Sequence, residues 1–169
     1  MEENPDARIV EMDTVYNDVS NGPFIQTFKF LQYDLLICIY HESKTTDEML
    51  RGILLLEQYL GPDIFNAEVE VLLTDRGSEF VSASEAEYRE DGSRRTRVYY
   101  CDSMCSWQKG SLENVHLLLR EICPNKTDLY ALGLTSQEKA NIISSHINSY
   151  PKKKLKGKSS FQLLQFINP

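Results

Sequence analysis

The chain has 169 residues, of which 41% are hydrophobic and 25% charged, a composition typical of globular proteins and not of fibrous or disordered ones. Its longest unbroken apolar run, residues 35–40, is far too short to span a bilayer, so we expect no membrane partner. The first residues are polar and acidic and are not expected to form a signal peptide. Four widely spaced cysteines in such a chain predict reduced thiols and a cytoplasmic protein.

The net charge of −7 conceals two halves of opposite sign. Residues 1–91 carry 20 acidic and 6 basic residues, whereas residues 92–169 carry 5 acidic and 12 basic ones. This pattern is expected if carboxylates bind metal ions beside a basic surface that binds phosphates. An ordinary solvated surface is the alternative that charge alone leaves open.

Three strands are predicted in the first quarter of the chain, because apolar residues alternate or run together between turn-forming residues. They cover residues 9–16, 24–30 and 35–40, and the segment 17–23, rich in Asn, Asp and Gly, forms the first turn. Short connections join antiparallel neighbours, so these strands should form a meander.

The hydrophobic period then changes to that of a helix. A capping box at Thr45 and Glu48 opens this helix, and Gly61 followed by Pro62 ends it. A second capping box is predicted at Thr135 and Glu138. The later elements are expected to be a strand at 68–74, a short helix at 84–90, a strand at 97–101, helices at 111–122 and 136–149, a basic loop at 151–158 and a helix at 159–167.

The resulting order, β-β-β-α-β-α-β-α-α, predicts an RNase H-like α/β fold. Its five-stranded mixed sheet would contain three antiparallel meander strands plus two parallel strands, flanked by helices.

Three carboxylates occupy positions where a charge needs an explanation. Asp13 lies mid-strand on the face expected to be apolar, where an unpaired charge is costly. Asp75 follows the apolar residues of the fourth strand, at the kind of strand end where ligands bind in α/β sheets. Glu113 lies in the first turn of a helix. Because the first and fourth strands of this fold are parallel neighbours, Asp13 and Asp75 should face each other, with Glu113 closing the site.

Carboxylate oxygens suit Mg²⁺ or Mn²⁺ better than Zn²⁺. Two such ions can activate a nucleophile and stabilise the leaving oxygen of a phosphodiester. Each carboxylate also has an ordinary explanation, which the residues alone leave open. Asp13 fits an edge-strand surface, Asp75 fits an Asp-Arg-Gly turn, and Glu113 fits a complement to the helix dipole.

Four separated blocks resemble the catalytic core of DDE transposases, and most closely the insertion sequence thirty family within the retroviral-integrase superfamily. The blocks are VEMDTVYNDVSNGPFIQTF, VLLTDRGSEF, YYCDSMCSWQKGSLENVHLLLR and SHINSYPKKKLKGKSSF, and they span roughly residues 9–169 in the family's order. The resemblance implies that Asp13, Asp75 and Glu113 are the catalytic carboxylates and hold two Mg²⁺ or Mn²⁺ ions per active site. It also implies DNA cleavage at transposon ends and joining of the 3′-hydroxyl to target DNA, without a covalent intermediate.

The resemblance also sets expectations about domains and partners. The chain departs from the family pattern at Ser103, Asn125 and Ser160, none of which is a catalytic carboxylate. We expect one catalytic domain over 1–169, with a core at 9–150 and a basic loop and helix at 151–169. The family's N-terminal DNA-binding region is expected to be absent. A bacterial protein acting in the cytoplasm at the nucleoid, a homo-oligomer on DNA and no small-molecule substrate are further expectations.

Further residues are candidates for contact with DNA. His116 and Arg120 share the predicted helix face of Glu113, and Lys109 and Asn114 flank that residue. A solvated polar surface is the alternative for each. Glu11, on the face of Asp13, is a candidate auxiliary ligand or, more simply, a salt-bridge partner. A basic run adds candidate phosphate contacts at Lys152, Lys153, Lys154, Lys156 and Lys158.

Two other functions remain open from the sequence. One is a different nuclease on the same fold, such as a ribonuclease that cuts RNA–DNA hybrids and joins no strands. The other is a non-catalytic DNA-binding or oligomerisation remnant of a decayed mobile element, against which the presence of all three carboxylates counts.

Overall fold

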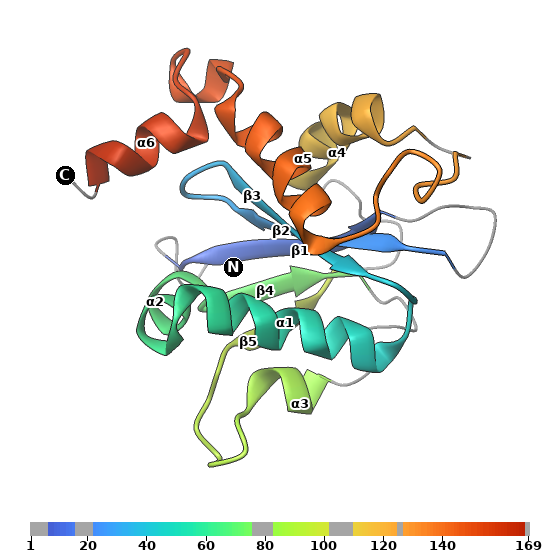
Figure 1. Ribbon diagram of the computed structural model, residues 1–169. Coiled ribbons are helices and arrows are strands. Elements are labelled where there is room, and N and C mark those ends of the chain that lie inside the picture. The colour runs from blue at the N-terminus through green and yellow to red at the C-terminus, as the bar shows by residue number, and fades with distance from the viewer. Residues whose placement is uncertain (1–6, 16–21, 76–82, 102–109, 125–126, 168–169) are drawn as a thin grey trace.

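The computed structural model describes residues 7–15, 22–75, 83–101, 110–124 and 127–167. Within these ranges a five-stranded mixed sheet lies between two layers of helices, α1 to α3 on one face and α4 to α6 on the other (Figure 1). The strands are β1 (Ile9–Val15), β2 (Phe24–Phe30), β3 (Leu35–His41), β4 (Val71–Thr74) and β5 (Arg97–Tyr100). The helices are α1 (Thr46–Leu60), α2 (Pro62–Glu68), α3 (Ala83–Glu87), α4 (Gly110–Ile122), α5 (Gln137–Ser149), the 3-10 turn η3 (Lys153–Leu155) and α6 (Ser160–Ile167).

The strand order is β3-β2-β1-β4-β5. β1 pairs with β2, and β2 with β3, in antiparallel register, because each connection between them is short. β4 pairs in parallel with β1 and with β5, because helices separate these strands along the chain. The mixed sheet and the meander predicted from the sequence are therefore confirmed.

Some element boundaries differ from prediction. The strand expected at 68–74 begins only at Val71, because Pro62 at the first helical position opens the additional helix α2. The cap of α5 is Ser136 and not Thr135, since the Ser136 side chain accepts a hydrogen bond from the Lys139 amide at 3.4 Å. The first capping residue, Thr45, is confirmed by its acceptance of the Glu48 amide at 3.2 Å.

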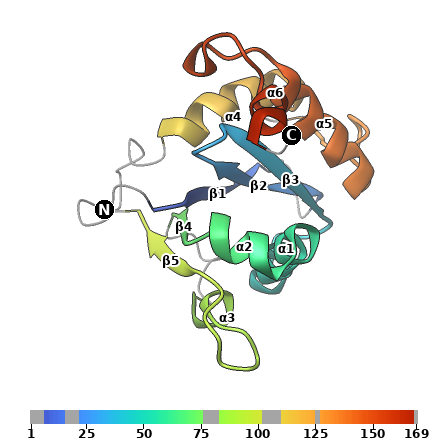
Figure 2. The same ribbon diagram turned by 90° about the vertical axis from the view of Figure 1, so that its left-hand side faces the viewer.

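The two faces of the sheet bury different cores, and Figure 2 shows the sheet between its two layers of helices. Successive residues of a strand point to opposite faces, so β1 contributes alternately to each core. The first core lies against α1 and α2 and includes Val10, Met12, Phe28, Leu56 and Phe65. The second lies against α4 and α5 and includes Val15, Ile25, Cys38, Val115 and Leu119. The odd-numbered residues of β1, Asp13 among them, therefore face the α4–α5 layer.

None of the helices in the described ranges combines the length and the apolar character needed to cross a membrane.

Candidate active site

The first two predicted carboxylates lie at neighbouring strand ends. The parallel register pairs Ile9 with Val71 and Glu11 with Leu73. The recorded pairing ends there, and the same register continued for two residues would bring Asp13 opposite Asp75. Both residues are half-buried, at the edge where β1 and β4 end. This is the juxtaposition that a shared divalent ion requires.

Backbone and side-chain contacts hold Asp13 in place. Its carboxylate Oδ1 accepts a hydrogen bond from the Thr14 amide at 2.7 Å, which orients the group. Its carbonyl oxygen accepts a hydrogen bond from the Thr27 hydroxyl at 3.1 Å, and Thr27 is the buried residue opposite Asp13 on β2. The position of this carboxylate is therefore set by the centre of the sheet and not by a loop.

Glu11 precedes Asp13 on the same face but lies deeper. Only 3% of Glu11 is exposed, and the fully buried Lys29 lies opposite it in the β1–β2 register. A metal ligand must reach the open end of the site, whereas Glu11 points into the sheet's covered face. This burial favours the structural explanation of Glu11 over a role as an auxiliary ligand.

Helix α4, which contains Glu113, lies on the same side of the sheet as Asp13. Val115 packs in the second core, which also contains Val15 of β1, and α4 contacts β1. Glu113 lies two residues before Val115 along α4, so its backbone is placed near the end of β1. The side chains of Glu113, Asn114 and His116, and all of Lys109, lie outside the described residues. Their roles stay predictions.

The structure describes only two of the three side chains expected to bind the metal ions, Asp13 and Asp75. Among the side chains that the structure describes, no group of three or more His, Cys, Asp and Glu residues is arranged to hold a metal ion. Asp13 and Asp75 supply two hard oxygen donors, the type that Mg²⁺ and Mn²⁺ prefer. The donor chemistry therefore fits, with Glu113 as the expected third ligand.

Arg120 lies two turns after Glu113 on α4 and is half-buried. Its Nη1 atom is buried and has no hydrogen-bond partner within the described ranges. Its charge also acts on the neighbouring Cys123: burial raises the pKa of that thiol, and the Arg120 charge opposes the rise. A buried guanidinium nitrogen without a partner is costly, so this position suits an anion.

The structure divides the basic run into two groups. Lys152 is committed to the fold, because its ammonium group donates to the Asp34 carbonyl at 2.6 Å and to the Ser160 hydroxyl at 2.8 Å. It also forms an ion pair with the Asp34 carboxylate at 2.9 Å. Lys153, Lys154, Lys156 and Lys158 are exposed. The buried network therefore occupies the ammonium group of Lys152, whose predicted contact with DNA stays a prediction.

Asp34 and Lys29, which form this network, were not among the residues predicted from the sequence. The signal for them was a lysine between two phenylalanines in strand β2, where a charge requires a buried partner.

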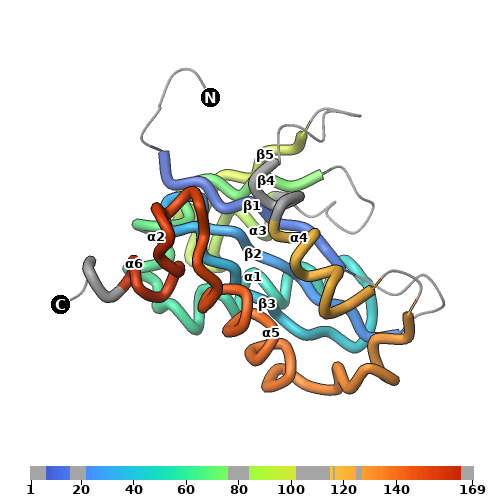
Figure 3. Tube along the Cα trace, turned by 90° about the horizontal axis from the view of Figure 1, so that it is seen from above, coloured from blue at the N-terminus to red at the C-terminus, as the bar shows by residue number. Residues whose placement is uncertain are grey.

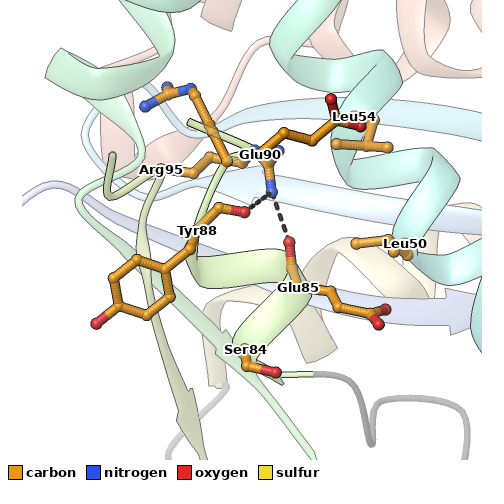
Figure 4. Close-up of a pocket in the computed structure, with 8 residues that line it drawn as sticks. Leu50, Leu54, Ser84, Glu85, Tyr88, Glu90 and Arg95 are labelled. Carbon is orange, nitrogen blue, oxygen red and sulfur yellow. Dashed lines mark hydrogen bonds between the residues drawn. The ribbon is translucent and has the colours of Figure 1, made fainter. Parts of the chain in front are cut away.

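An open cavity of about 490 Å³ lies between α1 and α3, on the face of the sheet away from Asp13 (Figure 4). Leu50 and Leu54 of α1 form one side of it, and Arg95 closes another. The Arg95 guanidinium donates to the carbonyls of Glu85 at 2.7 Å and Tyr88 at 3.2 Å, so it holds the segment after α3 together. We assign this cavity to the fold and not to the active site.

Comparison of sequences relates the chain to bacterial transposases. No protein-family model matches the chain. The transposase for insertion sequence element IS1086 of Cupriavidus metallidurans is 35% identical over 95 residues, which cover 56% of this chain and 26% of that protein. The chain is homologous to IS30-type transposases. The transposase InsI for element IS30A of Escherichia coli is 32% identical over 94 residues, which cover 56% of this chain and 23% of that protein. The chain thus spans about a quarter of the length of the curated relatives it matches.

Comparison of structures shows the fold of this IS30-type homologue. The catalytic core domain of BIV integrase matches with a TM-score of 0.64 at 15% identity, covering 95% of each chain. A chain of the simian T-cell lymphotropic virus intasome in complex with PP2A regulatory subunit B56 gamma matches with a TM-score of 0.67 at 16% identity, covering 92% of this chain and 53% of that one. These likenesses confirm the predicted RNase H-like fold.

Proposed function

We propose that the chain is the catalytic domain of a DDE transposase, which cleaves DNA at transposon ends and joins the freed strand to target DNA. The observation that supports this proposal is the parallel pairing of β1 with β4, which runs to Glu11 and Leu73, two residues before Asp13 and Asp75. The fold shared with integrase catalytic cores and the homology to transposases support it. We also propose that residues 1–169 act as one such domain.

In the proposed mechanism, Asp13 and Asp75 hold divalent ions, two Mg²⁺ or Mn²⁺ per site, together with Glu113. Bound there, the ions supply activation of a water or 3′-hydroxyl and stabilisation of the leaving oxygen of the phosphodiester. The chain contributes the position of the carboxylates. The Thr14 amide holds Asp13, and the sheet core holds the strand ends, so the donors need little reorganisation.

We propose that DNA lies along the α4 side of the sheet. The buried, unpartnered Nη1 of Arg120 supports a phosphate contact there. Lys109, Asn114 and His116 are proposed to contact the same DNA, on the strength of their positions around Glu113 in the sequence. The exposed Lys153, Lys154, Lys156 and Lys158 are proposed to contact its backbone.

We further propose that the protein assembles as a homo-oligomer on DNA and acts in the bacterial cytoplasm at the nucleoid. The first proposal draws support from the solved relatives, one an intasome and one an integrase core described as a trimeric form with magnesium. The second draws support from the bacterial origin of the transposase relatives.

The experiment that tests the function is metal-dependent DNA cleavage and strand transfer, with the chain joined to the DNA-binding region of an IS30-type transposase. Asp75→Asn should lower strand transfer by about a hundredfold or more, because one metal ligand loses its charge. The exposed Asp63 on α2 offers the matched control Asp63→Asn, which should remain active. Full strand transfer by Asp75→Asn contradicts the assignment, and cleavage confined to RNA–DNA hybrids points instead to a ribonuclease.

A further inference from the structure

Residues 152–158, here named the lysine loop, form a preorganised turn between α5 and α6. The Lys152 amide donates to the Lys158 carbonyl at 3.0 Å, and the Gly157 amide donates to the Lys152 carbonyl at 3.0 Å. Lys156 and Gly157 have left-handed backbone conformations, with φ of 54° and 82°, which reverse the chain. The loop is therefore closed by its own backbone and needs no partner to take this shape.

A buried polar contact fixes the lysine loop to the sheet. Asp34, in the turn between β2 and β3, accepts from Lys152 on its carbonyl and its carboxylate. Lys29 makes the same two contacts, at 2.6 Å and 2.8 Å, and the Ser160 hydroxyl donates to the Asp34 carbonyl at 2.7 Å. Lys29 and Ser160 are fully buried, and Asp34 is 7% exposed. We name these four residues, Asp34, Lys29, Lys152 and Ser160, the Asp34 anchor.

The lysine loop presents four ammonium groups to solvent. Lys153, Lys154, Lys156 and Lys158 are all exposed within six residues of chain. In the part of the chain that the structure describes, Lys153, Lys154 and Lys156 form no ion pair. Because the closed loop holds these positive charges close together, they repel one another, and binding of a polyanion reduces this repulsion. Burial lowers the pKa of Lys29 to about 8, and the charges of Lys152 and Lys154 add to this effect.

The lysine loop lies at the end of the sheet away from the carboxylates. The Leu31 amide donates to the Ile9 carbonyl, so the β2–β3 turn lies beside the first residue of β1. Asp13 is four residues further on, about 13 Å along the strand. Figures 1 and 3 show the loop between α5 and α6 on the side of the chain's ends, opposite the end toward which β4 points.

From this arrangement we propose that the lysine loop is a preformed DNA-backbone site, separate from the carboxylates, and that Asp34 is its positioning residue. The proposal rests on the proposed function in one respect, that DNA is the polyanion. The loop would hold a stretch of the same duplex beyond the one at Asp13 and Asp75. Asp34 acts only through Lys152, which it fixes at the base of the loop.

The first test measures binding to a duplex of about 30 base pairs by fluorescence anisotropy, in EDTA so that no cleavage occurs. Lys153→Gln with Lys154→Gln should lower affinity about tenfold and reduce the slope of log K against log salt by about 2. Lys44→Gln with Lys139→Gln is the matched control, because both lysines are exposed and the change in charge is the same. An equal loss in both variants, or no loss in the first, overturns the proposed site.

The second test distinguishes positioning from charge. Asp34→Asn removes a negative charge near the loop, so electrostatics alone would strengthen DNA binding. If Asp34 positions the loop through Lys152, the same variant should bind about threefold more weakly, since the loop loses its fixed base. Asparagine tolerates the left-handed backbone of residue 34, which has φ of 52°.

Ser160→Ala provides a second variant with no change in charge, and it should also weaken binding. Thermal unfolding confirms that each variant is folded at the assay temperature, and if Asp34→Asn does not fold, Ser160→Ala carries the test. Tighter binding by Asp34→Asn, or unchanged binding by a folded Ser160→Ala, overturns the role of the anchor. Because binding is measured without metal, an active Asp75→Asn variant would reject the proposed function and leave this result intact.

Discussion

At Gly52 the absence of a side chain decides how α1 meets the sheet. A Cβ there would lie 1.7 Å from Gln26 Oε1 and 2.9 Å from His41 Nε2. The space holds a buried polar chain, in which His41 Nε2 and Gln26 Oε1 lie 2.9 Å apart and the Gln26 amide donates to the Met49 carbonyl at 3.1 Å. A small residue in the helix thus allows buried polar groups to be satisfied.

Gly52→Ala should therefore destabilise the protein, although Gly to Ala in an exposed helix stabilises by about 1 kcal/mol. The Cβ displaces Gln26 from buried partners, and we expect a loss of about 2 kcal/mol in the free energy of unfolding, measured with urea. Adding Gln26→Ala removes the closer of the two clashes, so Gly52→Ala should cost less in that background. A Gly52→Ala variant as stable as the parent would contradict the geometry.

Lys29 is the residue for which the structure predicts a pH effect. Burial lowers its pKa from 10.5 to about 8. Between pH 8 and 10.5 the unfolded chain binds more protons at this site than the folded chain, so stability should rise with pH in this range. Urea unfolding of the parent and of Lys29→Met at several pH values isolates this contribution to the free energy of unfolding. The free energy of unfolding of the parent should rise relative to Lys29→Met, and a falling difference would contradict the buried ammonium.

At the scale of elements, α5 covers an open edge of the sheet. β3 is an edge strand, and such strands expose unpaired backbone groups. Asn148 of α5 accepts from the Leu36 amide at 2.8 Å and donates to the Leu36 carbonyl at 2.7 Å. Gln137 does the same for the Tyr40 amide and the Cys38 carbonyl, at 2.9 Å and 2.8 Å. Two amide side chains therefore replace the missing neighbouring strand.

Asn148→Ala should lower the free energy of unfolding by about 2 kcal/mol or more, because it leaves a buried amide and a buried carbonyl of Leu36 without partners. Chemical denaturation measures this loss, and light scattering should show more aggregation through the opened edge. Ser145, exposed on the same helix, offers the control Ser145→Ala, for which we expect a change within about 0.5 kcal/mol. Equal effects at both positions would argue against the capped edge.

At the scale of the whole molecule, the two oppositely charged parts of the sequence become different layers. The acidic residues 1–91 form β1 to β4 and the layer of α1 to α3, while the layer of α4 to α6 comes from the basic residues 92–169. Asp13 faces the second layer, so the basic half lies on the carboxylates' side of the sheet. A site that binds both metal ions and a polyanion needs this separation, because the carboxylates bind the cations and the basic layer attracts the polyanion.

The same arrangement predicts that divalent ions stabilise the protein. Two carboxylates at adjacent strand ends repel each other, and Mn²⁺ or Mg²⁺ removes this repulsion by binding the folded state. At an ion concentration of about 100 times Kd, the stabilisation should reach about 2.7 kcal/mol. Thermal unfolding with and without Mn²⁺ measures it. Asp13→Asn and Asp75→Asn should lose most of the shift, Asp63→Asn should keep it, and a shift that survives in Asp13→Asn would place the ion elsewhere.

The sequence by itself determined the order of the strands and singled out the three carboxylates of the proposed site. Hydrophobic period and turn residues predicted the meander and its parallel extension, because these patterns are local. The carboxylates Asp13 and Asp75 stood out for a local reason as well, since each is a charge at an apolar strand position or strand end. Helix α2 and the cap at Ser136 were missed, because neighbouring residues compete closely for such boundaries.

Only the tertiary structure decided which lysines are available. Lys152 is indistinguishable from its neighbours in the sequence, yet Asp34, 118 positions away, buries its ammonium group. Likewise, the capping of β3 by Asn148 and the close approach of Gln26 to Gly52 of α1 depend on contacts between distant segments. Burial and hydrogen-bond partners are properties of the packed chain, because the free energy of a polar group depends on what surrounds it in space and not on its neighbours in sequence.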